Sequence, residues 1–186
     1  VRFPELAITH GDLSRGIAMK NFAHLHVHSC FSFQDGASGV EKLVKSAGEL
    51  GMNAMAITDH NNLSAALRFT KSAKEYGIKP IHGAEITLED GSHLVLLAEN
   101  PKGYSNISKI ITEAYMSRDR QNIARVLEER DAGETRKILK MRRLQPKVNC
   151  ASLEEHNEGI IALSGCMRGA IPMLIRNGRF GCARNL

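Results

Sequence analysis

Three histidines at alternate positions are the residues of this chain best placed to do chemistry. His24, His26 and His28 lie within residues 22–29, and side chains two positions apart on a β-strand share a face at a spacing of roughly 6.5–7 Å. The neutral imidazole is available near pH 7 and is the commonest metal-binding side chain. For a single histidine, a half-buried strand with hydrogen bonds to loops is the alternative. Three in register favour a metal site.

Further potential ligands lie at or just after the ends of other predicted strands. The complete set that we assign as metal ligands is His26, His28, Asp35, His60, Glu85, His93 and Cys166. Only His93 begins its strand, whereas chemistry in parallel α/β folds collects at the carboxyl ends. Histidine, carboxylate and thiolate ligands suit zinc, manganese or iron, and seven are too many for one tetrahedral zinc. We therefore expect two or three divalent ions, which would stabilise the attacking and leaving oxygens of a phosphoryl transfer.

Several of these residues also have a structural explanation. Asp35 precedes a glycine, which is a common turn pair, and Asp59 could cap the helix that follows it. Glu85 could pair with a lysine, and Cys166 could be a small buried hydrophobic residue. The deeper position of His24 in its strand favours a core or supporting role.

The elements that must position these ligands alternate between strand and helix. Apolar periodicity and turn residues predict strands over 22–28, 54–58, 78–88, 93–98 and 159–164, and helices over 40–50, 63–76, 104–116, 120–144 and 169–175. We expect breaks at Gly83 in the third strand and near Gly133 in the fourth helix. This alternation predicts the α/β class, with a parallel sheet or barrel.

Length and composition are those of one globular domain. The 186 residues are 42% hydrophobic and 24% charged. No apolar run approaches the ~20 residues of a membrane span, and the first residues lack a secretory signal pattern. The four cysteines form no CxxC pair, as expected for reduced thiols in the cytoplasm. We interpret residues 1–18, which lack periodicity, as a disordered N-terminal extension, and residues 19–186 as the domain.

One segment accounts for the net charge of +5. Residues 118–147 hold ten lysines or arginines and five acidic residues, which equals the whole excess. Such a segment could meet a phosphate backbone, although interspersed charges on a helix more often form a solvated face. The sequence leaves both interpretations open.

Five stretches of the chain together resemble the PHP (polymerase and histidinol phosphatase) domain. They are residues 22–29, 33–37, 56–63, 77–85 and 153–166, and the resemblance covers about residues 20–180. They look most like the version at the N-terminus of the bacterial DNA polymerase III alpha subunit and its error-prone relatives. The resemblance implies a distorted (β/α)7 TIM-like barrel with a trinuclear metal centre at the carboxyl ends of its strands.

The resemblance also implies roles for individual residues. His26, His28, Asp35, His60, Glu85, His93 and Cys166 match seven of the family's nine ligands. Asp59 belongs to the catalytic machinery as the residue that orients His60. The last two ligands, an Asp-x-His pair, do not occur in this chain. The resemblance therefore implies a C-terminally truncated domain and an incomplete barrel.

In function, the resemblance implies a metal-dependent phosphoesterase. The polymerase-type domain is linked to 3′–5′ exonuclease-type trimming of DNA ends or to scaffolding, in proteins that serve replication or translesion synthesis. DNA, the rest of the polymerase and other replisome subunits are the implied partners. A free-standing phosphatase of the histidinol-phosphate type and a non-catalytic structural module are the alternatives. No Asp-x-Asp pair is present to hold the magnesium ions of a polymerase palm, so nucleotide addition is not expected of this chain.

Overall fold

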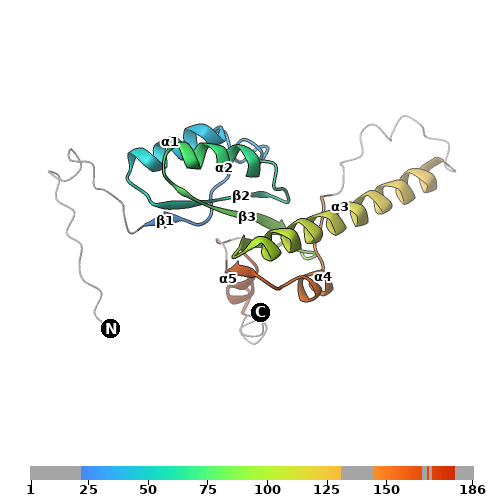
Figure 1. The fold of residues 1–186 in the computed structure, drawn as a ribbon. Coiled ribbons are helices and arrows are strands. Elements are labelled where there is room, and N and C mark those ends of the chain that lie inside the picture. The colour runs from blue at the N-terminus through green and yellow to red at the C-terminus, as the bar shows by residue number, and fades with distance from the viewer. Residues whose placement is uncertain (1–21, 131–144, 165–166, 168, 179–186) are drawn as a thin grey trace.

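The computed structural model describes residues 22–130, 145–164, 167 and 169–178. Its elements, in chain order, are β1 (Ala23–His24), α1 (Val40–Glu49), β2 (Ala54–His60), α2 (Ala66–Glu75), β3 (Lys79–Thr87), β4 (His93–Ala98), α3 (Pro101–Arg130), α4 (Cys150–Glu155), β5 (Ile160–Leu163) and α5 (Ala170–Arg176). Figure 1 shows α1 and α2 side by side over the first strands, whereas the long α3 extends beyond the sheet. The predicted α/β class is confirmed.

The five strands form one mixed sheet in the order β1-β2-β3-β4-β5. β1, β2 and β3 are parallel, whereas β4 is antiparallel to both β3 and β5. Within the described residues, the edge strands β1 and β5 do not pair with each other, so the sheet is open. The expectation of a parallel sheet was wrong for β4, because a tight turn joins it to β3. In that turn Leu88 N donates to Ser92 O at 2.8 Å and Gly91 N donates to Leu88 O at 2.9 Å, and such a turn can only connect antiparallel strands.

The first strand is shorter than the sequence predicts. β1 covers Ala23–His24 only, and the chain beyond it keeps partial contact with β2. Thr58 N donates to Val27 O at 2.9 Å, and Val27 N donates to Thr58 Oγ1 at 3.2 Å. His26 and His28 therefore lie in an irregular segment after the strand, where period-two alternation no longer sets their directions.

The third strand matches the predicted range closely, but it runs unbroken through Gly83, where a break was expected. A Cβ at this position would lie 2.4 Å from the Leu96 carbonyl oxygen of β4. Glycine is therefore needed here for close approach of two strands, and it does not break β3.

Alternation along the strands separates a helix-covered face from the opposite face. On the covered face, Val40, Val44 and Phe69 from α1 and α2 pack with Ile57 of β2. A second cluster joins β3 and β4 to α3 and includes Ile86, Leu96, Ile107 and Ile110. Each such buried side chain contributes about 1.5–3 kcal/mol through removal of apolar area from water. These two clusters hold the strands, and so the residues at their ends, in fixed register.

The opposite face of the sheet carries a smaller apolar cluster. Ala56, Val95 and Leu97 are buried there, with Ile81 and Leu163 packed against them. The same face carries candidate ligands. His60 and Glu85 lie four residues beyond Ala56 and Ile81 along β2 and β3. His93 lies two residues before Val95 in β4.

The helices agree with their predicted positions, apart from α3 and α4. One helix, Pro101–Arg130, replaces the predicted pair over 104–116 and 120–144 as far as Arg130. The extension over 1–18, the expected break near Gly133 and Cys166 lie outside the described residues. The short α4 was not predicted, although Asn149 marks its start by accepting a 2.8 Å hydrogen bond from Ser152 N. Within the described part of the chain, no helix has both the length and the apolar character required to cross a membrane.

Candidate metal centre

Glu85 lies at the centre of a cluster of histidines near the end of β3. Its Oε2 is 2.6 Å from Nε2 of His26, and its Oε1 is 2.6 Å from Nδ1 of His93. Oε1 is also 3.0 Å from Nδ1 of His60. The carboxylate is buried, while the three rings are partly exposed. Three segments distant in sequence thus place imidazoles on one carboxylate.

His28 and Asp35 complete the cluster. Nε2 of His28 lies 3.1 Å from Nε2 of His26 and 3.7 Å from Oε2 of Glu85. Oδ2 of Asp35 lies 2.9 Å from Nε2 of His60 and 3.9 Å from Nε2 of His28. The structure therefore brings together six of the seven ligands proposed from the sequence, and Cys166 lies outside the described residues.

Strand register explains why His60, Glu85 and His93 meet. His60 is paired with Glu85 across β2 and β3, and paired residues point to the same face. His93 is paired with Thr87, which is two residues beyond Glu85 on that face. Because β4 is antiparallel, its first residue lies at the edge where β2 and β3 end. The placement of His93 at a strand start, which conflicts with the rule for parallel sheets, thus follows from strand direction.

Asp59 is buried and holds the loop that connects β1 to α1. Its carboxylate accepts hydrogen bonds from Ser29 N and Ser29 Oγ, both at 2.7 Å, and from Ser32 Oγ at 2.6 Å. It does not cap α2, whose N-cap is Ala65. Its link to His60 runs through Ser32, whose Oγ accepts a 3.1 Å hydrogen bond from His60 N.

Ser32 also determines the orientation of His28. The single hydroxyl proton of Ser32 is donated to the Asp59 carboxylate, which can only accept. Nδ1 of His28, 3.0 Å from the same oxygen, must then be the donor. A neutral His28 ring therefore carries its proton on Nδ1 and leaves Nε2, which faces Glu85 and His26, free to bind a metal. Sequence reasoning missed Ser29 and Ser32, since serine near a histidine motif has no distinctive spacing.

A compact turn places Asp35. Gly36 N and Asp35 N donate to Ser32 O at 2.8 and 3.0 Å, and Gln34 has a left-handed φ of 71°. A Cβ on Gly36 would lie 2.0 Å from the Ser29 carbonyl oxygen. Asp35 and Gly36 thus form part of a turn, as the structural explanation from the sequence proposed. The turn also places the Asp35 carboxylate next to His60.

The charges of the cluster are coupled. Burial by itself would raise the pKa of Glu85, but its interaction with His28 and its hydrogen bond from His60 outweigh burial and lower that pKa well below its usual range. The hydrogen bond to Glu85 raises the pKa of His60, against the opposing effect of burial and with help from Asp35. The hydrogen bond from His60 in turn lowers the pKa of Asp35. Without metal, the raised pKa of His60 favours a proton on this ring, which pairs with the buried carboxylate.

The donor set fits divalent metal ions. Three overlapping groups each place their ligand atoms within 4.8 Å of one another, namely His26, His28 and Glu85; His28, Asp35 and His60; and His60, Glu85 and His93. Bonds of about 2.0–2.1 Å at a tetrahedral angle put two nitrogen ligands about 3.3 Å apart. The 3.1 Å between the Nε2 atoms of His26 and His28 is close to that value. His28, His60 and Glu85 are each shared by two of these groups, so the three groups form one continuous cluster.

The remaining histidines among the described residues lie away from the cluster. His24 is exposed, and its ring contacts that of Phe22 with 4.8 Å between the ring centroids. The expectation that His24 is a core residue was therefore wrong. Nε2 of His156 contacts Oε1 of Glu113 at 3.0 Å, between α4 and α3.

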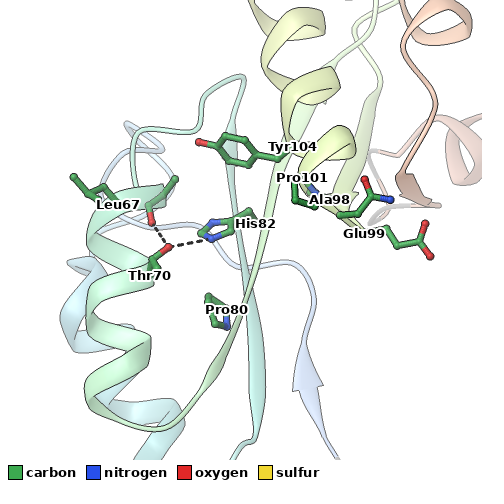
Figure 2. A pocket seen from close by; sticks show the side chains of 10 residues that line it. Leu67, Thr70, Pro80, His82, Ala98, Glu99, Pro101 and Tyr104 are labelled. Carbon is green, nitrogen blue, oxygen red and sulfur yellow. Dashed lines mark hydrogen bonds between the residues drawn. The ribbon is translucent and has the colours of Figure 1, made fainter.

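His82 lines a separate cavity of about 560 Å³ between α2 and α3 (Figure 2). Its Nε2 lies 3.1 Å from Oγ1 of Thr70, and Tyr104 approaches from α3. Burial lowers the pKa of His82. This histidine is therefore neutral near pH 7 and packs within the fold.

A model of the PHP domain matches residues 24–186. The chain belongs to the PHP domain family. An error-prone DNA polymerase from Symbiobacterium thermophilum is 48% identical over 159 residues, which cover 86% of this chain and 14% of that protein. A DNA polymerase III subunit alpha from Treponema pallidum is 34% identical over 177 residues, covering 88% of this chain and 13% of that protein. This PHP chain thus spans about one seventh of the length of these curated relatives.

Among solved structures, a protein from Bifidobacterium adolescentis that is provisionally described as a metal-dependent phosphoesterase is similar to this PHP domain. It is 22% identical, with a TM-score of 0.43, over 73% of this chain and 50% of that chain.

Proposed function

We propose that this PHP domain is a metal-dependent phosphodiesterase module that hydrolyses DNA ends within a larger replicative or error-prone DNA polymerase. The observation that supports this most is the convergence of four histidines and Asp35 around the buried carboxylate of Glu85. The polymerase relatives favour DNA and the remaining polymerase and replisome subunits as partners. The same similarity to DNA polymerases favours the cytoplasm as the location of this protein.

The cluster would hold two or three ions of zinc, manganese or iron. When bound, they supply positive charge that stabilises the attacking and leaving oxygens at phosphorus. The chain's own residues would hold the ions and orient the ligands. His28, His60 and Glu85 connect the three groups, and Asp59 positions His28 through Ser32. Cys166, which follows β5 in the sequence, is proposed as a further ligand on the strength of its motif.

Charge balance supports binding of cations by this cluster. A buried carboxylate is stable only when it is paired, and here the pairing is made by imidazoles that can exchange protons for metal near neutral pH.

The first experiment measures metal and turnover in the same preparations. We expect the full chain to retain divalent metal after dialysis, by elemental analysis, and to hydrolyse 3′-labelled single-stranded DNA with manganese. The His28→Ala variant should lose both metal and activity. The His24→Ala variant is the matched control, because His24 is a neighbouring exposed histidine outside the cluster.

The alternatives give different outcomes. Bound metal without hydrolysis of any phosphoester would indicate a structural module, and preference for histidinol phosphate would indicate a free-standing phosphatase. Unchanged metal stoichiometry in His28→Ala would remove His28 from the site.

A further inference from the structure

We propose that a pocket beside the metal centre binds an unpaired nucleobase of a single-stranded nucleic acid, with Phe33 and Tyr115 as its aromatic surfaces. The proposal rests on the proposed function, since it names the group that adjoins the reacting phosphate. It concerns a surface of this chain that lies outside the metal ligands except for His60.

The pocket has a volume of about 440 Å³ and is lined by aromatic and amide side chains, among them Phe31, Phe33, Gln34, Tyr115 and Gln145. This volume falls within the range of about 300–1,000 Å³ typical of small-ligand sites. His60 forms part of its wall and also contacts Asp35 and Glu85. The pocket therefore adjoins the candidate metal centre through His60.

Phe33 is the most unusual residue of the pocket. Its side chain is 86% exposed, so it contributes little to the core. The loop that carries it is held on both sides, by the hydrogen bonds of Ser32 to Asp59 and of Asp35 to His60. A large aromatic side chain is thus exposed to water on a loop that is anchored next to the candidate metal centre. Stacking on a flat ligand would bury that ring.

Tyr115 offers a second ring, and its position is also fixed. The guanidinium carbon of Arg118 lies 4.4 Å from the centroid of the Tyr115 ring, a cation–π contact that restrains the ring. Arg118 adds a positive charge beside the pocket, which is partly offset by its ion pair with Asp119. An aromatic surface next to a cation suits a base that is linked to a phosphate.

The polar walls favour a heterocycle over a plain hydrocarbon. The side-chain amide of Asn61 is committed to Thr87, to which it donates at 3.0 Å and from which it accepts at 2.9 Å. Asn62 is likewise committed to main-chain groups of Phe31, His60 and Ser64. These hydrogen bonds hold the walls of the pocket in place.

Gln34 and Gln145 bring further side-chain amides to the pocket. These amides can form hydrogen bonds with the donor and acceptor atoms at the edge of a base.

The test uses the absence of tryptophan from the chain. The Phe33→Trp variant of the full chain carries one fluorophore in the pocket and keeps an aromatic ring at an exposed position. We expect its emission to be quenched by oligodeoxythymidine, and much less by an abasic oligomer of equal length and charge. Phe22→Trp, at an exposed position just before β1, is the matched control and should show no such difference. In Phe33→Ala, binding of fluorescent oligodeoxythymidine should weaken by about 5- to 100-fold, as expected for loss of one stacking contact.

Equal responses of the Phe33→Trp variant to the two oligomers, or none, would overturn the nucleobase pocket. Hydrolysis of bis(p-nitrophenyl) phosphate, which has no base, tests the proposed function separately. Turnover of that ester without base-dependent quenching would reject the pocket alone. Base-dependent quenching without turnover of any ester would reject the phosphodiesterase and keep the pocket as a binding site.

Discussion

Ser32 donates a 2.6 Å hydrogen bond to Asp59, and this contact determines which nitrogen of a neutral His28 carries the proton. The buried carboxylate takes the hydroxyl proton, so the serine oxygen is left as an acceptor for Nδ1–H of His28 and for the main-chain N–H of His60. One hydroxyl thus connects a carboxylate outside the cluster to two candidate ligands inside it. Such supporting contacts orient ligands and tune their basicity.

Replacing Ser32 by alanine should lower metal affinity by about 10- to 100-fold, the usual effect of losing a partner that orients a ligand. The His28 ring is then free to rotate, and Asp59 loses one of its three donors. Titration with a metal-sensitive dye measures the affinity. Ser46→Ala, at an exposed position of α1, is the control. Equal affinities in the two variants would mean that Ser32 does not position His28.

Gly36→Ala should destabilise the fold by about 1–3 kcal/mol, as expected for overpacking. The new Cβ would lie 2.0 Å from the Ser29 carbonyl oxygen, so the loop that carries Asp35 must move. Denaturant unfolding measures the change. Gly39→Ala is the matched control, because its Cβ would have only a side-chain oxygen of Glu41 nearby, at 3.8 Å. A variant as stable as the control would show that the turn yields easily.

Glu85→Gln should lower metal affinity by about 100-fold or more, beyond the effect of a supporting residue. The neutral amide cannot balance the charge of a bound cation at the centre of the cluster. The same change removes the largest cause of the raised pKa of His60, so that pKa should fall in the metal-free variant. Calorimetry and proton NMR of the imidazoles measure the two effects, with Glu89→Gln as the exposed control. An unchanged His60 titration would contradict the coupling.

Metal affinity should rise as pH increases from about 6 to 8, since each ion displaces protons from imidazoles. The pKa of His60 is raised above its ordinary value of 6.5 by the hydrogen bond to Glu85. Protons therefore still compete with metal ions for this ring near neutral pH. Calorimetric titration in buffers of different ionisation enthalpy reports the protons released. Binding that is independent of pH, without proton release, would mean that His60 is not a ligand.

The metal-free chain should be most stable in mildly acidic solution. His60, with a raised pKa when folded, stabilises fully below its unfolded value of 6.5, and this contribution is lost as pH rises through the folded pKa. Glu85, with a lowered pKa, stabilises fully above its unfolded value of 4.5, and its contribution is lost as pH falls towards the folded pKa. Thermal unfolding in chelator across this range measures the profile. A maximum well above neutral pH would contradict the sign of the His60 effect.

The sequence was sufficient to predict most elements and to identify the residues that the fold gathers into the candidate cluster. Apolar spacing predicts α1 and α2 closely, because burial against β2 requires a continuous apolar stripe. Polar residues that follow buried strands identify His60 and Glu85, because strand ends in an α/β sheet meet at one edge. The local sequence pattern was enough to predict an element wherever its own apolar residues determine which of its faces is buried.

The tertiary structure decided what depends on direction and on irregular backbone. His93 joins the cluster only because β4 runs antiparallel, and pairing partners are not encoded in a strand's own periodicity. His26 and His28 converge from an irregular segment after β1, where alternation gives no direction. Asp59 supports the site through Ser29 and Ser32, contacts between residues 27 to 30 positions apart that only chain folding creates. Residue types thus determined which atoms can bind metal, whereas strand direction and loop geometry determined that those atoms meet.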